Sequence, residues 1–513
     1  MKIQISAVII AFNEEKNIAR CLRSLQGVAD EVIIIDSFSV DKTVEIATSL
    51  GAKVQQRAFD GYASQKNYGN DLAQNDWILS LDADEELSPI LKESILQAKA
   101  NPQADAYKFN RAIFYFNQWI RHGNSYPDCK VRLWNKQKGS WGGGSVHETL
   151  QLTAGTKTAK LAGDLYHYSY ESVEAQAAQG NKYTSLAAAD MFASGKRATW
   201  GKLLLSPVSN FLKGYFFRGG LLDGKQGLGV SAMFAHGVFL KYLKLFALQE
   251  SFKISLIIST YNRKDALELV LLSVLQQTQM PFEVIVADDG SRADTQELIA
   301  SFQSKFSVPL RHCWHADEGF KLSQIRNKAM AMAQGDYLVS IDGDMVLNRH
   351  FVADQRALAQ KGFFVQGSRV LLSDEKTKEV LAQKNINIRW WDSGIKNRFN
   401  AMHIPFMMRR MAKKRDDIRA IRGCSMAFWR EDCIRINGFN EAIIGWGRED
   451  SEFAVRLINS GVYRHNIKFA AVAYHLYHPE NSRATLPEND RILADAIAHK
   501  ATYCEKGINA YLS

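Results

Sequence analysis

The sequence predicts an α/β protein made of two doubly wound domains in tandem. The first observation is an internal repeat, because "QKNYGNDLAQNDWILSLDAD" (65–84) aligns without a gap on "IRNKAMAMAQGDYLVSIDGD" (325–344). The second is that apolar strand runs alternate with helical patterns upstream of both copies, as in an open α/β sheet. The repeat distance of about 250 residues is the size of a domain and far exceeds the roughly 20 to 50 residues of a solenoid unit.

The elements come in the same order in both copies. An apolar strand starts at residue 7 and again at residue 255, and each is followed by an Asn and a helical pattern. The segments 31–47 and 283–300 then each read as a strand, an Asp-rich turn and a helix. A third apolar run ends in Asp-x-Asp in both copies. All these polar motifs fall at the carboxyl ends of strands, where a doubly wound sheet has its ligand crevice.

The composition is that of a globular chain. Its 513 residues are 46% hydrophobic and 23% charged, which is enough to build ordinary cores. The six cysteines lack metal-ligand spacing, so we expect reduced core thiols in a cytosolic protein. The apolar start "MKIQISAVIIAF" runs into "NEEK" without a small-residue cleavage site, and we interpret it as a first strand rather than a signal peptide.

The net charge of +10 predicts an anionic partner, a description that fits nucleotides, phospholipids and nucleic acids. The sequence has neither zinc-finger spacing nor an aromatic RNA-binding pattern. We therefore expect no nucleic-acid partner.

Polar residues close the first two strands of each copy. Asn13 and Asn262 stand where an N-cap residue belongs, so the helix starts that they mark are expected to offer backbone N–H groups to an anionic ligand. Asp36 and Asp288 close the second strand, where a carboxylate can accept a hydrogen bond from a uracil or a ribose hydroxyl. Ordinary turn and cap residues give the same pattern at any single one of these positions.

The paired carboxylates Asp82/Asp84 and Asp342/Asp344 are more informative. Two carboxylates at the end of a buried strand repel each other unless a cation or hydrogen-bond donors compensate. Mg²⁺ and Mn²⁺ take such oxygen ligands and share them with substrate phosphates. Because the pair occurs twice in matching contexts, we predict a divalent cation, Mn²⁺ or Mg²⁺, at these carboxylates.

Both halves resemble family 2 glycosyltransferases of the A-type fold. The first half resembles the bacterial glucosyltransferases of the lipopolysaccharide inner core, through "AFNEEKNI", "DEVIIIDSFSVDKT", "WIRHGNSYPDCKVRLW" and "GGLLDGKQGLGVSAMFAHGVFLKYLKL". The second half is similar to catalytic domains of chondroitin-polymerase and galactosyltransferase type, through "DEGFKLSQIRNKAM", "RGCSMAFWREDCIRINGFNE" and "GWGREDSEFAVRL". The resemblance implies two Rossmann-like nucleotide-diphospho-sugar transferase domains, at 1–200 and 251–513, with an amphipathic connector at 201–250.

The resemblance also implies ligand roles. Asp84, Asp344 and His475 are expected to hold the metal, with His478 as the weaker candidate in the same segment, "VAYHLYHPEN". The donor is expected to be a nucleotide sugar, above all a UDP-sugar. The residues expected to bind it are Asn13, Glu15, Asp36, Lys66, Asn67, Asp82, Thr260, Asn262, Asp288, Asp289, Asp317, Arg326, Asn327, Asp342 and Trp446.

Acidic residues are the candidate catalytic bases, because an attacking acceptor hydroxyl must lose its proton. In the second half the family pattern places the base at Asp450, with Glu449 orienting the acceptor. In the first half two bases remain open, Glu148 and Asp128, of which Glu148 is favoured by its order in the chain. This chain has Lys130 where the family usually carries Gln, a departure that concerns the acceptor contacts. The resemblance implies inversion at the anomeric carbon.

The connector mixes large apolar residues with lysines and glycines. Charges interrupt its best apolar window, so we expect that it does not cross a membrane. As a helix it carries Lys241 and Lys244 on one side and an apolar face on another, formed by Phe234, Val238, Tyr242 and Leu245. That arrangement suits an anionic membrane surface, and the alternative is a helix packed between the domains. The basic stretch 396–423 is expected to be an acceptor loop or a second lipid contact.

These expectations combine into one leading function. The chain is predicted to be a peripheral enzyme on the cytoplasmic face of the bacterial inner membrane, with two transferase sites that add sugars to a lipid-linked or lipooligosaccharide core acceptor. One alternative is a capsule polysaccharide polymerase, which also pairs two such domains. Another is one catalytic domain beside a domain that only binds the acceptor.

Overall fold

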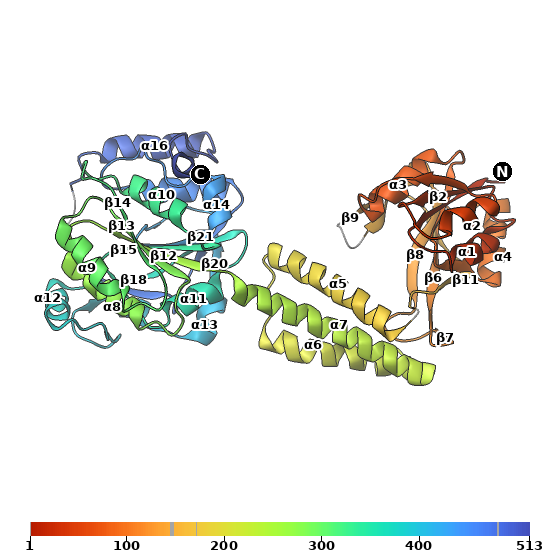
Figure 1. Ribbon diagram of the computed structural model, residues 1–513, viewed down its shortest axis with the longest axis horizontal. Helices are drawn as coiled ribbons and strands as arrows, with labels where there is room; N and C mark the ends of the chain where they lie inside the picture. Colours follow the sequence, from red (N-terminus) through yellow and green to blue (C-terminus); the bar gives the residue numbers. More distant parts are fainter. Residues whose placement is uncertain (1, 144–147, 171, 480–481, 513) are drawn as a thin grey trace. The chain divides into compact units, whose positions relative to one another are not determined.

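The computed structural model describes residues 2–143, 148–170, 172–479 and 482–512. The chain forms two compact units, of which the first comprises Met1–Asp190 and Ala198–Phe246 and the second comprises Met191–Arg197 and Ala247–Ser513 (Figure 1). The segment predicted as a connector, 201–250, is helical and lies in the first unit as far as Phe246.

The first unit is built on a nine-stranded sheet with the order β3-β2-β1-β4-β8-β6-β11-β5, and β7 pairs with β6. Strands β1 to β4 are parallel, and β8 is antiparallel to β4. A separate ribbon pairs β9 with β10. The bounds are β1 Ile5–Ala11, β2 Glu31–Asp36, β3 Lys53–Gln56, β4 Trp77–Asp82, β5 Glu85–Leu87, β6 Ala106–Tyr115, β7 Gln118–Ile120, β8 Asp128–Asn135, β9 Gly139–Gly143, β10 Glu148–Leu152 and β11 Thr158–His167.

Amphipathic helices cover this sheet. In α1 the buried residues Ile18, Cys21, Leu22 and Leu25 recur at helical spacing, and they pack on the apolar strand runs. The helices are α1 Ile18–Leu25, α2 Thr43–Ser49, α3 Tyr62–Leu72, α4 Pro89–Ala100, α5 Val173–Ala193, α6 Trp200–Leu212 and α7 Gly224–Ser251.

The second unit repeats the first part of this topology. Its eight-stranded sheet has the order β14-β13-β12-β15-β21-β17-β22-β20, and a four-stranded sheet has the order β16-β23-β18-β19. Strand β12 is buried over its whole length, as expected of a central parallel strand with both faces covered. The bounds are β12 Ile254–Thr260, β13 Glu283–Asp288, β14 Leu310–Trp314, β15 Tyr337–Asp342, β16 Met345–Leu347, β17 Phe363–Gln366, β18 Ser368–Leu372, β19 Ile395–Lys396, β20 Lys413–Arg415, β21 Ser425–Trp429, β22 Tyr463–Asn466 and β23 Val472–His475.

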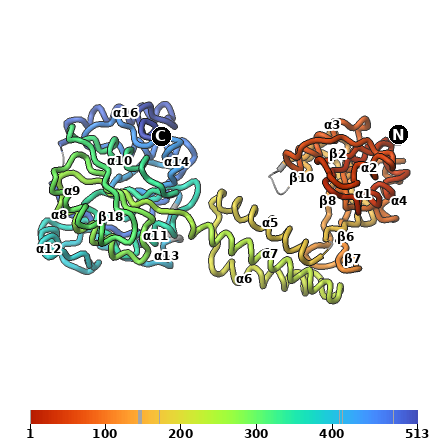
Figure 2. The backbone as a smooth tube through the Cα atoms, in the orientation of Figure 1, coloured from red at the N-terminus to blue at the C-terminus, as the bar shows by residue number. Residues whose placement is uncertain are grey.

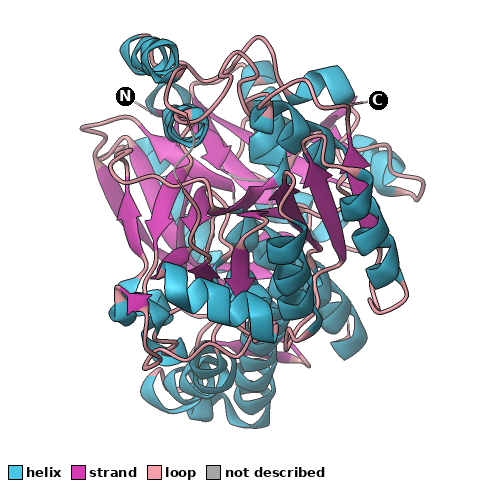
Figure 3. Ribbon diagram, turned by 90° about the vertical axis from the view of Figure 1, so that its left-hand side faces the viewer, coloured by secondary structure: helices cyan, strands magenta, loops and turns pink. Residues whose placement is uncertain are grey.

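Helices flank the strands of the second unit, and Figure 3 distinguishes helices from strands by colour. Helix α15 begins with the predicted catalytic residues Glu449 and Asp450, and α16 follows later in the chain. The predicted basic stretch 396–423 contains α13 and β20, and β20 pairs with β22. The helices are α8 Lys264–Leu275, α9 Ala293–Gln303, α10 Leu322–Met332, α11 Phe351–Leu358, α12 Asp374–Gln383, α13 Pro405–Met411, α14 Arg430–Arg435, α15 Glu449–Asn459 and α16 Leu486–Ala498.

Helices α5, α6 and α7 lie beside one another (Figure 2). The sequence predicted that α7 presents Leu245 on an apolar outer face and Lys244 on a basic one. That part of the prediction is wrong, because Leu245 is fully buried and Lys244 Nζ donates hydrogen bonds to Asn181, Thr184 and Ser185 of α5. The packing of α7 against α5 and α6 decided which side of the helix faces inward.

One helix among the described residues, Gly220–Ser251, is long and apolar enough to cross a membrane by length and composition. The sequence predicted that this segment does not cross. The finding supports crossing only weakly, because the core helix of a soluble protein meets the same two conditions.

The cysteines follow the predicted pattern with one difference. Five of the six are buried, and Cys129 at the second position of β8 is exposed. Side chains alternate along a strand between the two faces, so a cysteine in an apolar-looking strand can still point outward.

Candidate active sites

The predicted polar residues gather at one edge of the sheet in each unit. In the first unit Ala11 pairs with Asp36 and Ile10 with Asp82. In the second unit Thr260 pairs with Asp288 and Ser259 with Asp342. The two sets of pairs occupy equivalent positions in the repeat, so the duplication preserves the register of the strands that carry the site.

Asn13 and Asn262 hold loops together and do not cap helices. Helices α1 and α8 begin at Ile18 and Lys264, with Asn17 and Arg263 as their caps, so the N-cap prediction is wrong. Both asparagines have a positive φ, of 54° and 48°. The Oδ1 of Asn13 accepts from the Val40 N–H, and the Oδ1 of Asn262 accepts from the Arg292 N–H. Asn tolerates the left-handed region, which places these side chains toward the neighbouring loop.

Asp36 and Asp288 are fully buried and serve the same loops. Asp36 accepts a hydrogen bond from the Ser39 N–H at 2.9 Å, and Asp288 accepts one from the Ser291 N–H at 2.8 Å. His312 Nε2 lies 3.0 Å from the other oxygen of Asp288. These carboxylates therefore shape the two loops that follow the second strand.

Neighbouring acidic residues also bond to these loops; Asp289 is buried, whereas Asp317 and Glu15 are exposed. Asp289 pairs with His315 at 2.7 Å and accepts from the Lys321 N–H, and burial raises the pKa of this carboxyl group. Asp317 accepts from the Tyr261 hydroxyl at 2.9 Å. In the first unit Glu15 is exposed and accepts from the Lys42 N–H.

A candidate metal centre lies in the second unit at Asp344, His475 and His478. One ligand atom from each of the three residues lies within 4.8 Å of the others. Burial raises the pKa of Asp344, with the histidines opposing this and Asp342 reinforcing it, and burial lowers the pKa of His475. Asp344 Oδ1 is buried without a hydrogen-bond partner among the described residues. A buried carboxylate oxygen beside two imidazoles is a donor set that suits a divalent cation, because the ion restores the charged carboxylate.

Arg326 bridges two acidic residues beside this centre. Its guanidinium is 1% exposed and lies 2.8 Å from Asp342 and 3.5 Å from Glu449. Burial, and then the charge of Asp450, raise the pKa of Glu449 to about 7. Asp450 Oδ2 accepts a hydrogen bond from the Gly423 N–H at 2.6 Å. Glu449 thus lies beside the first Asp of the second Asp-x-Asp, and Asp450 is the next residue of α15.

Helix α16 holds the loop that leads into these acids. Asn489 donates to the carbonyl oxygens of Ile444 and Gly447, at 3.1 and 3.0 Å. Gly445 has φ +76°, and a Cβ there would lie 2.3 Å from Thr485 Oγ1, so only glycine fits. Trp446, between the two glycines, is 38% exposed and available for stacking.

The first unit has a matching cluster in which Lys66 takes the place of Arg326. Lys66 Nζ lies 3.0 Å from Asp82 and 3.1 Å from Glu148. Arg132 lies 3.1 Å from Asp82 and 3.3 Å from the buried Glu85. Although burial alone would raise it, the charges of Lys66 and Arg132 hold the pKa of Asp82 well below its ordinary range.

The two candidate bases of the first unit occupy different surroundings. Glu148 shares Lys66 with Asp82, as Glu449 shares Arg326 with Asp342. Asp128 pairs with Arg111 at 2.7 Å and with Lys130 at 3.4 Å. The residue after Glu148 is Thr149, so this cluster has no second acid in the place of Asp450.

Asn67 and Asn327 form hydrogen bonds that connect their helices to neighbouring segments of the chain. Asn327 is fully buried, and its amide bonds to the backbone of Phe439 and to Glu441. Asn67 exchanges two hydrogen bonds with the backbone of Trp141. These hydrogen bonds tie the two amides to neighbouring backbone, and that both residues line the nucleotide pocket stays a prediction. Thr260 is also buried, and its hydroxyl has no hydrogen-bond partner among the described residues.

Sequence reasoning missed His167, which occupies in the first unit the place of His475. His167 pairs with Glu85 across β11 and β5, and His475 pairs with Met345 across β23 and β16. The residue after each histidine donates its backbone N–H to the second Asp of the Asp-x-Asp. Tyr168 donates to the carbonyl oxygen of Asp84, and Leu476 donates to that of Asp344, both at 3.0 Å. His167 Nε2 lies 3.1 Å from Asp84. The shared dipeptides Tyr166-His167 and Tyr474-His475 were the available signal.

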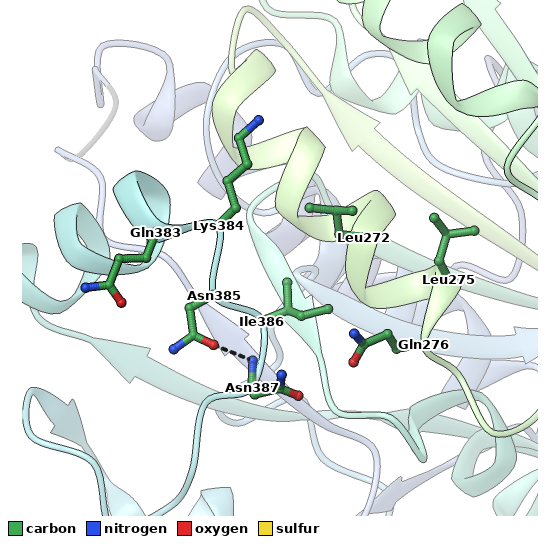
Figure 4. A pocket seen from close by; sticks show the side chains of 8 residues that line it. All are labelled: Leu272, Leu275, Gln276, Gln383, Lys384, Asn385, Ile386 and Asn387. Atoms are coloured by element: carbon green, nitrogen blue, oxygen red, sulfur yellow. Dashed lines mark hydrogen bonds between the residues drawn. The ribbon is translucent and has the colours of Figure 1, made fainter.

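Two hollows of about 600 and 260 Å³ lie elsewhere in the second unit, beyond the ends of α8 and α12. Figure 4 shows the larger one, and none of the predicted site residues lines either hollow. Leu347 and Tyr474 border the smaller hollow. Leu347 lies on β16, which follows Asp344, and Tyr474 lies on β23 beside His475.

Comparison with known proteins agrees with this geometry. The profile of "Glycosyl transferase family 2" matches residues 6–157 and 255–435, and that of "N-terminal domain of galactosyltransferase" matches 405–479. An uncharacterized glycosyltransferase of Rickettsia felis is 36% identical over 48% of this chain and 90% of its own. The lipopolysaccharide core biosynthesis glycosyltransferase LpsC of Rhizobium meliloti is 28% identical over 48% of this chain and 93% of its own.

A longer relative and a solved structure are also similar. Chondroitin synthase of Escherichia coli is 26% identical over 45% of this chain, which corresponds to 36% of the synthase. The structure of S. aureus TarS 1-349 in complex with UDP aligns with 48% of this chain and 68% of its own, at 18% identity and a TM-score of 0.34. Because the family profile matches both halves and more than half of the residues, the chain belongs to glycosyl transferase family 2 and is a glycosyltransferase with two A-type domains in tandem.

Proposed function

We propose that the chain is a bifunctional enzyme in which each unit transfers one sugar from a nucleotide-sugar donor, with a UDP-sugar as the expected donor. The duplicated cluster carries this proposal. Each unit has an Asp-x-Asp, a histidine at the same register beside the second Asp, and a buried cation that joins the first Asp to a later Glu. A unit that only bound the acceptor would have no need of all three features.

In the second unit Asp344, His475 and His478 would hold a divalent cation, Mn²⁺ or Mg²⁺. In the first unit Asp84 and His167 would contribute to the corresponding site. When bound, such an ion neutralises the negative charge that develops on the diphosphate leaving group. Asp342 and Asp82 are assigned to the donor, since each is fixed by a buried cation that orients it.

We assign the proton transfer to acidic residues of the two clusters. Asp450 would accept the proton of the attacking hydroxyl, while Glu449 orients the acceptor and Trp446 stacks on a sugar face. Glu148 takes the role of base in the first unit, because it shares a cation with Asp82 as Glu449 does with Asp342. A single displacement by the acceptor hydroxyl inverts the anomeric carbon.

The proposed acceptor is a lipid-linked or lipooligosaccharide core saccharide. The similarity to LpsC supports this choice, and the work would then take place on the cytoplasmic face of the inner membrane. The similarity to chondroitin synthase supports a second candidate, a polymerase that alternates two sugars. A third candidate, in which the first unit only binds the acceptor, is favoured by Thr149 at the place of Asp450.

Two substitutions test the proposal. The purified protein is screened with several nucleotide sugars, Mn²⁺ and core saccharide acceptors, and both nucleotide release and products are measured. We expect Asp84→Ala and Asp344→Ala each to abolish one transfer, by about a hundredfold or more, and to leave the other unchanged. The exposed acids Asp71 and Asp294 provide matched Ala controls in the two units.

Each outcome decides between the candidates. One added sugar per intact site supports the core enzyme, whereas a ladder of products supports the polymerase. If Asp84→Ala leaves every transfer intact, the first unit is an acceptor-binding domain. If neither variant changes nucleotide release, the assignment of the two clusters is wrong.

A further inference from the structure

An apolar ridge runs along the helical part of the first unit. It starts in α6, continues through the π-helical turn Lys213–Phe217 and ends in the 3₁₀ turn Gly220–Asp223. Phe217 is 85% exposed, Leu205 69% and Leu222 67%. Soluble surfaces rarely gather so many large apolar side chains on one contiguous segment. The members of the apolar ridge are Leu204, Leu205, Val208, Leu212, Phe216, Phe217, Leu221 and Leu222.

The residues of the apolar ridge recur at helical spacing, so they form one continuous face. Leu204, Val208 and Leu212 are four residues apart, so they share one side of α6, and Phe216 continues the same step into the π-helical turn. The opposite side points inward, because Leu203 and Gly214 are buried. One side of the segment is therefore packed, while large apolar side chains dominate the exposed side.

Polar anchors hold the ridge in place. Asn124 Nδ2 donates to the carbonyl oxygen of Asn210 at 3.0 Å. Asp223 accepts from the N–H groups of Arg121 and His122, and its carboxylate also pairs with the His122 ring at 2.9 Å. The ridge is thus a fixed part of the unit, which lowers the entropy lost when a partner covers it.

The charges around the ridge identify the kind of partner. The segment 198–246 has six basic residues, Lys202, Lys213, Arg218, Lys225, Lys241 and Lys244, and one acidic residue, Asp223. Asp223 is buried and bound to His122, while the first four basic residues are exposed. Large apolar side chains bordered by lysine and arginine fit a bilayer surface with anionic headgroups.

We propose that the apolar ridge inserts into the headgroup and acyl boundary of an anionic phospholipid bilayer and holds the protein there peripherally. The ridge replaces the face of α7 that the sequence indicated, because Leu245 and Lys244 of that face are used inside the unit. This inference stands apart from the proposed glycosyl transfer, since it concerns lipid and requires no donor or acceptor.

Vesicle binding tests it directly. The full-length protein is sedimented with vesicles of phosphatidylcholine alone and with vesicles that also contain phosphatidylglycerol, at low and at high salt, without nucleotide sugars. We expect binding to the anionic vesicles, weakening at high salt because the headgroup attraction is screened. Alkaline carbonate should release the protein from cell membranes, whereas a spanning α7 would keep it in the membrane pellet and overturn the peripheral arrangement.

Substitutions locate the contact. Phe217→Ser with Leu222→Ser should weaken binding by about tenfold or more. The two substitutions remove apolar surface that membrane insertion would otherwise take out of water. Lys213→Glu with Arg218→Glu should weaken binding to anionic vesicles alone. Ile90→Ser is the matched control, because Ile90 is 64% exposed on α4, away from the ridge.

Besides retention in the carbonate pellet, three results would overturn the proposal. The first is wild-type vesicle binding by the Phe217/Leu222 variant. The second is equal binding to neutral and anionic vesicles. The third is a dimer in light scattering that the same substitutions dissociate, with no vesicle binding, which would make the ridge an interface between two copies of this chain. Circular dichroism of each variant identifies a loss of binding that is caused by misfolding.

Discussion

One buried cation in each unit holds two acidic side chains in a fixed relation. Lys66 joins Asp82 to Glu148, and Arg326 joins Asp342 to Glu449. The choice of cation changes the geometry, because an ammonium is a point charge and a guanidinium is a planar fork. Glu449 accordingly sits beside one nitrogen of the fork while another nitrogen contacts Asp342.

Removal of this cation gives a prediction for the first unit. In Lys66→Met two carboxylates lose their shared partner, so we expect loss of the first transfer and about 2–3 kcal/mol less stability in urea unfolding. Removing one partner of a fully buried ion pair costs about 3–5 kcal/mol. The expected loss is smaller here because the side chains of Asp82 and Glu148 are 26% and 22% exposed. Lys66→Arg should restore stability in part. An unchanged first transfer in Lys66→Met would contradict the role of this cluster.

Single residues show where sequence reasoning succeeds and where it fails. The Asp-x-Asp pairs were predictable because the repeat places the same carboxylates in the same strand context. His167 was missed because its position beside Asp84 depends on antiparallel pairing between β5 and β11. These two strands are far apart in the chain.

At the level of elements, parallel strands were the most predictable part of the fold. Strands β12, β13 and β15 are buried on both faces, so apolar residues dominate them and do not alternate strictly with polar ones. Helix starts were less predictable, because Asn13 and Asn262 satisfy a neighbouring loop rather than their own helix. The exposed side of α7 was not predictable, since the helical pattern alone cannot say which face packs on α5.

Helix α16 supports the second site through Asn489, and Asp490 of the same helix pairs with Arg448. Asn489→Ala removes the two hydrogen bonds that hold the carbonyls of Ile444 and Gly447, at an expected local cost of about 1–3 kcal/mol. We expect a higher KM for the acceptor in the second transfer, because Trp446 lies in the released loop. The first transfer in the same sample is the internal control, and the exposed Arg491→Ala on the same helix is the matched variant. Equal losses in both transfers would indicate general unfolding instead.

At the scale of the whole molecule, each unit has its own core and its own cluster. The core of the first unit centres on the side chains of β1, β2 and β4, and that of the second on those of β12, β13 and β15. A unit with its own core is able to unfold as one cooperative body. If both clusters are active as proposed, each should bind its ligand independently of the other.

Calorimetry tests this independence. We expect two unfolding transitions, and a nucleotide with Mn²⁺ at about a hundred times its Kd should stabilise each unit that binds it by about 2.7 kcal/mol. In Asp344→Ala the transition of the second unit should no longer respond, while that of the first unit shifts as before, because the carboxylate beside His475 is lost. Chelation with EDTA should return the wild-type transitions to their ligand-free positions. A single transition that shifts as a whole would mean that the two units unfold together. If both transitions of Asp344→Ala still shifted on addition of nucleotide and Mn²⁺, Asp344 would not be a ligand of the metal centre.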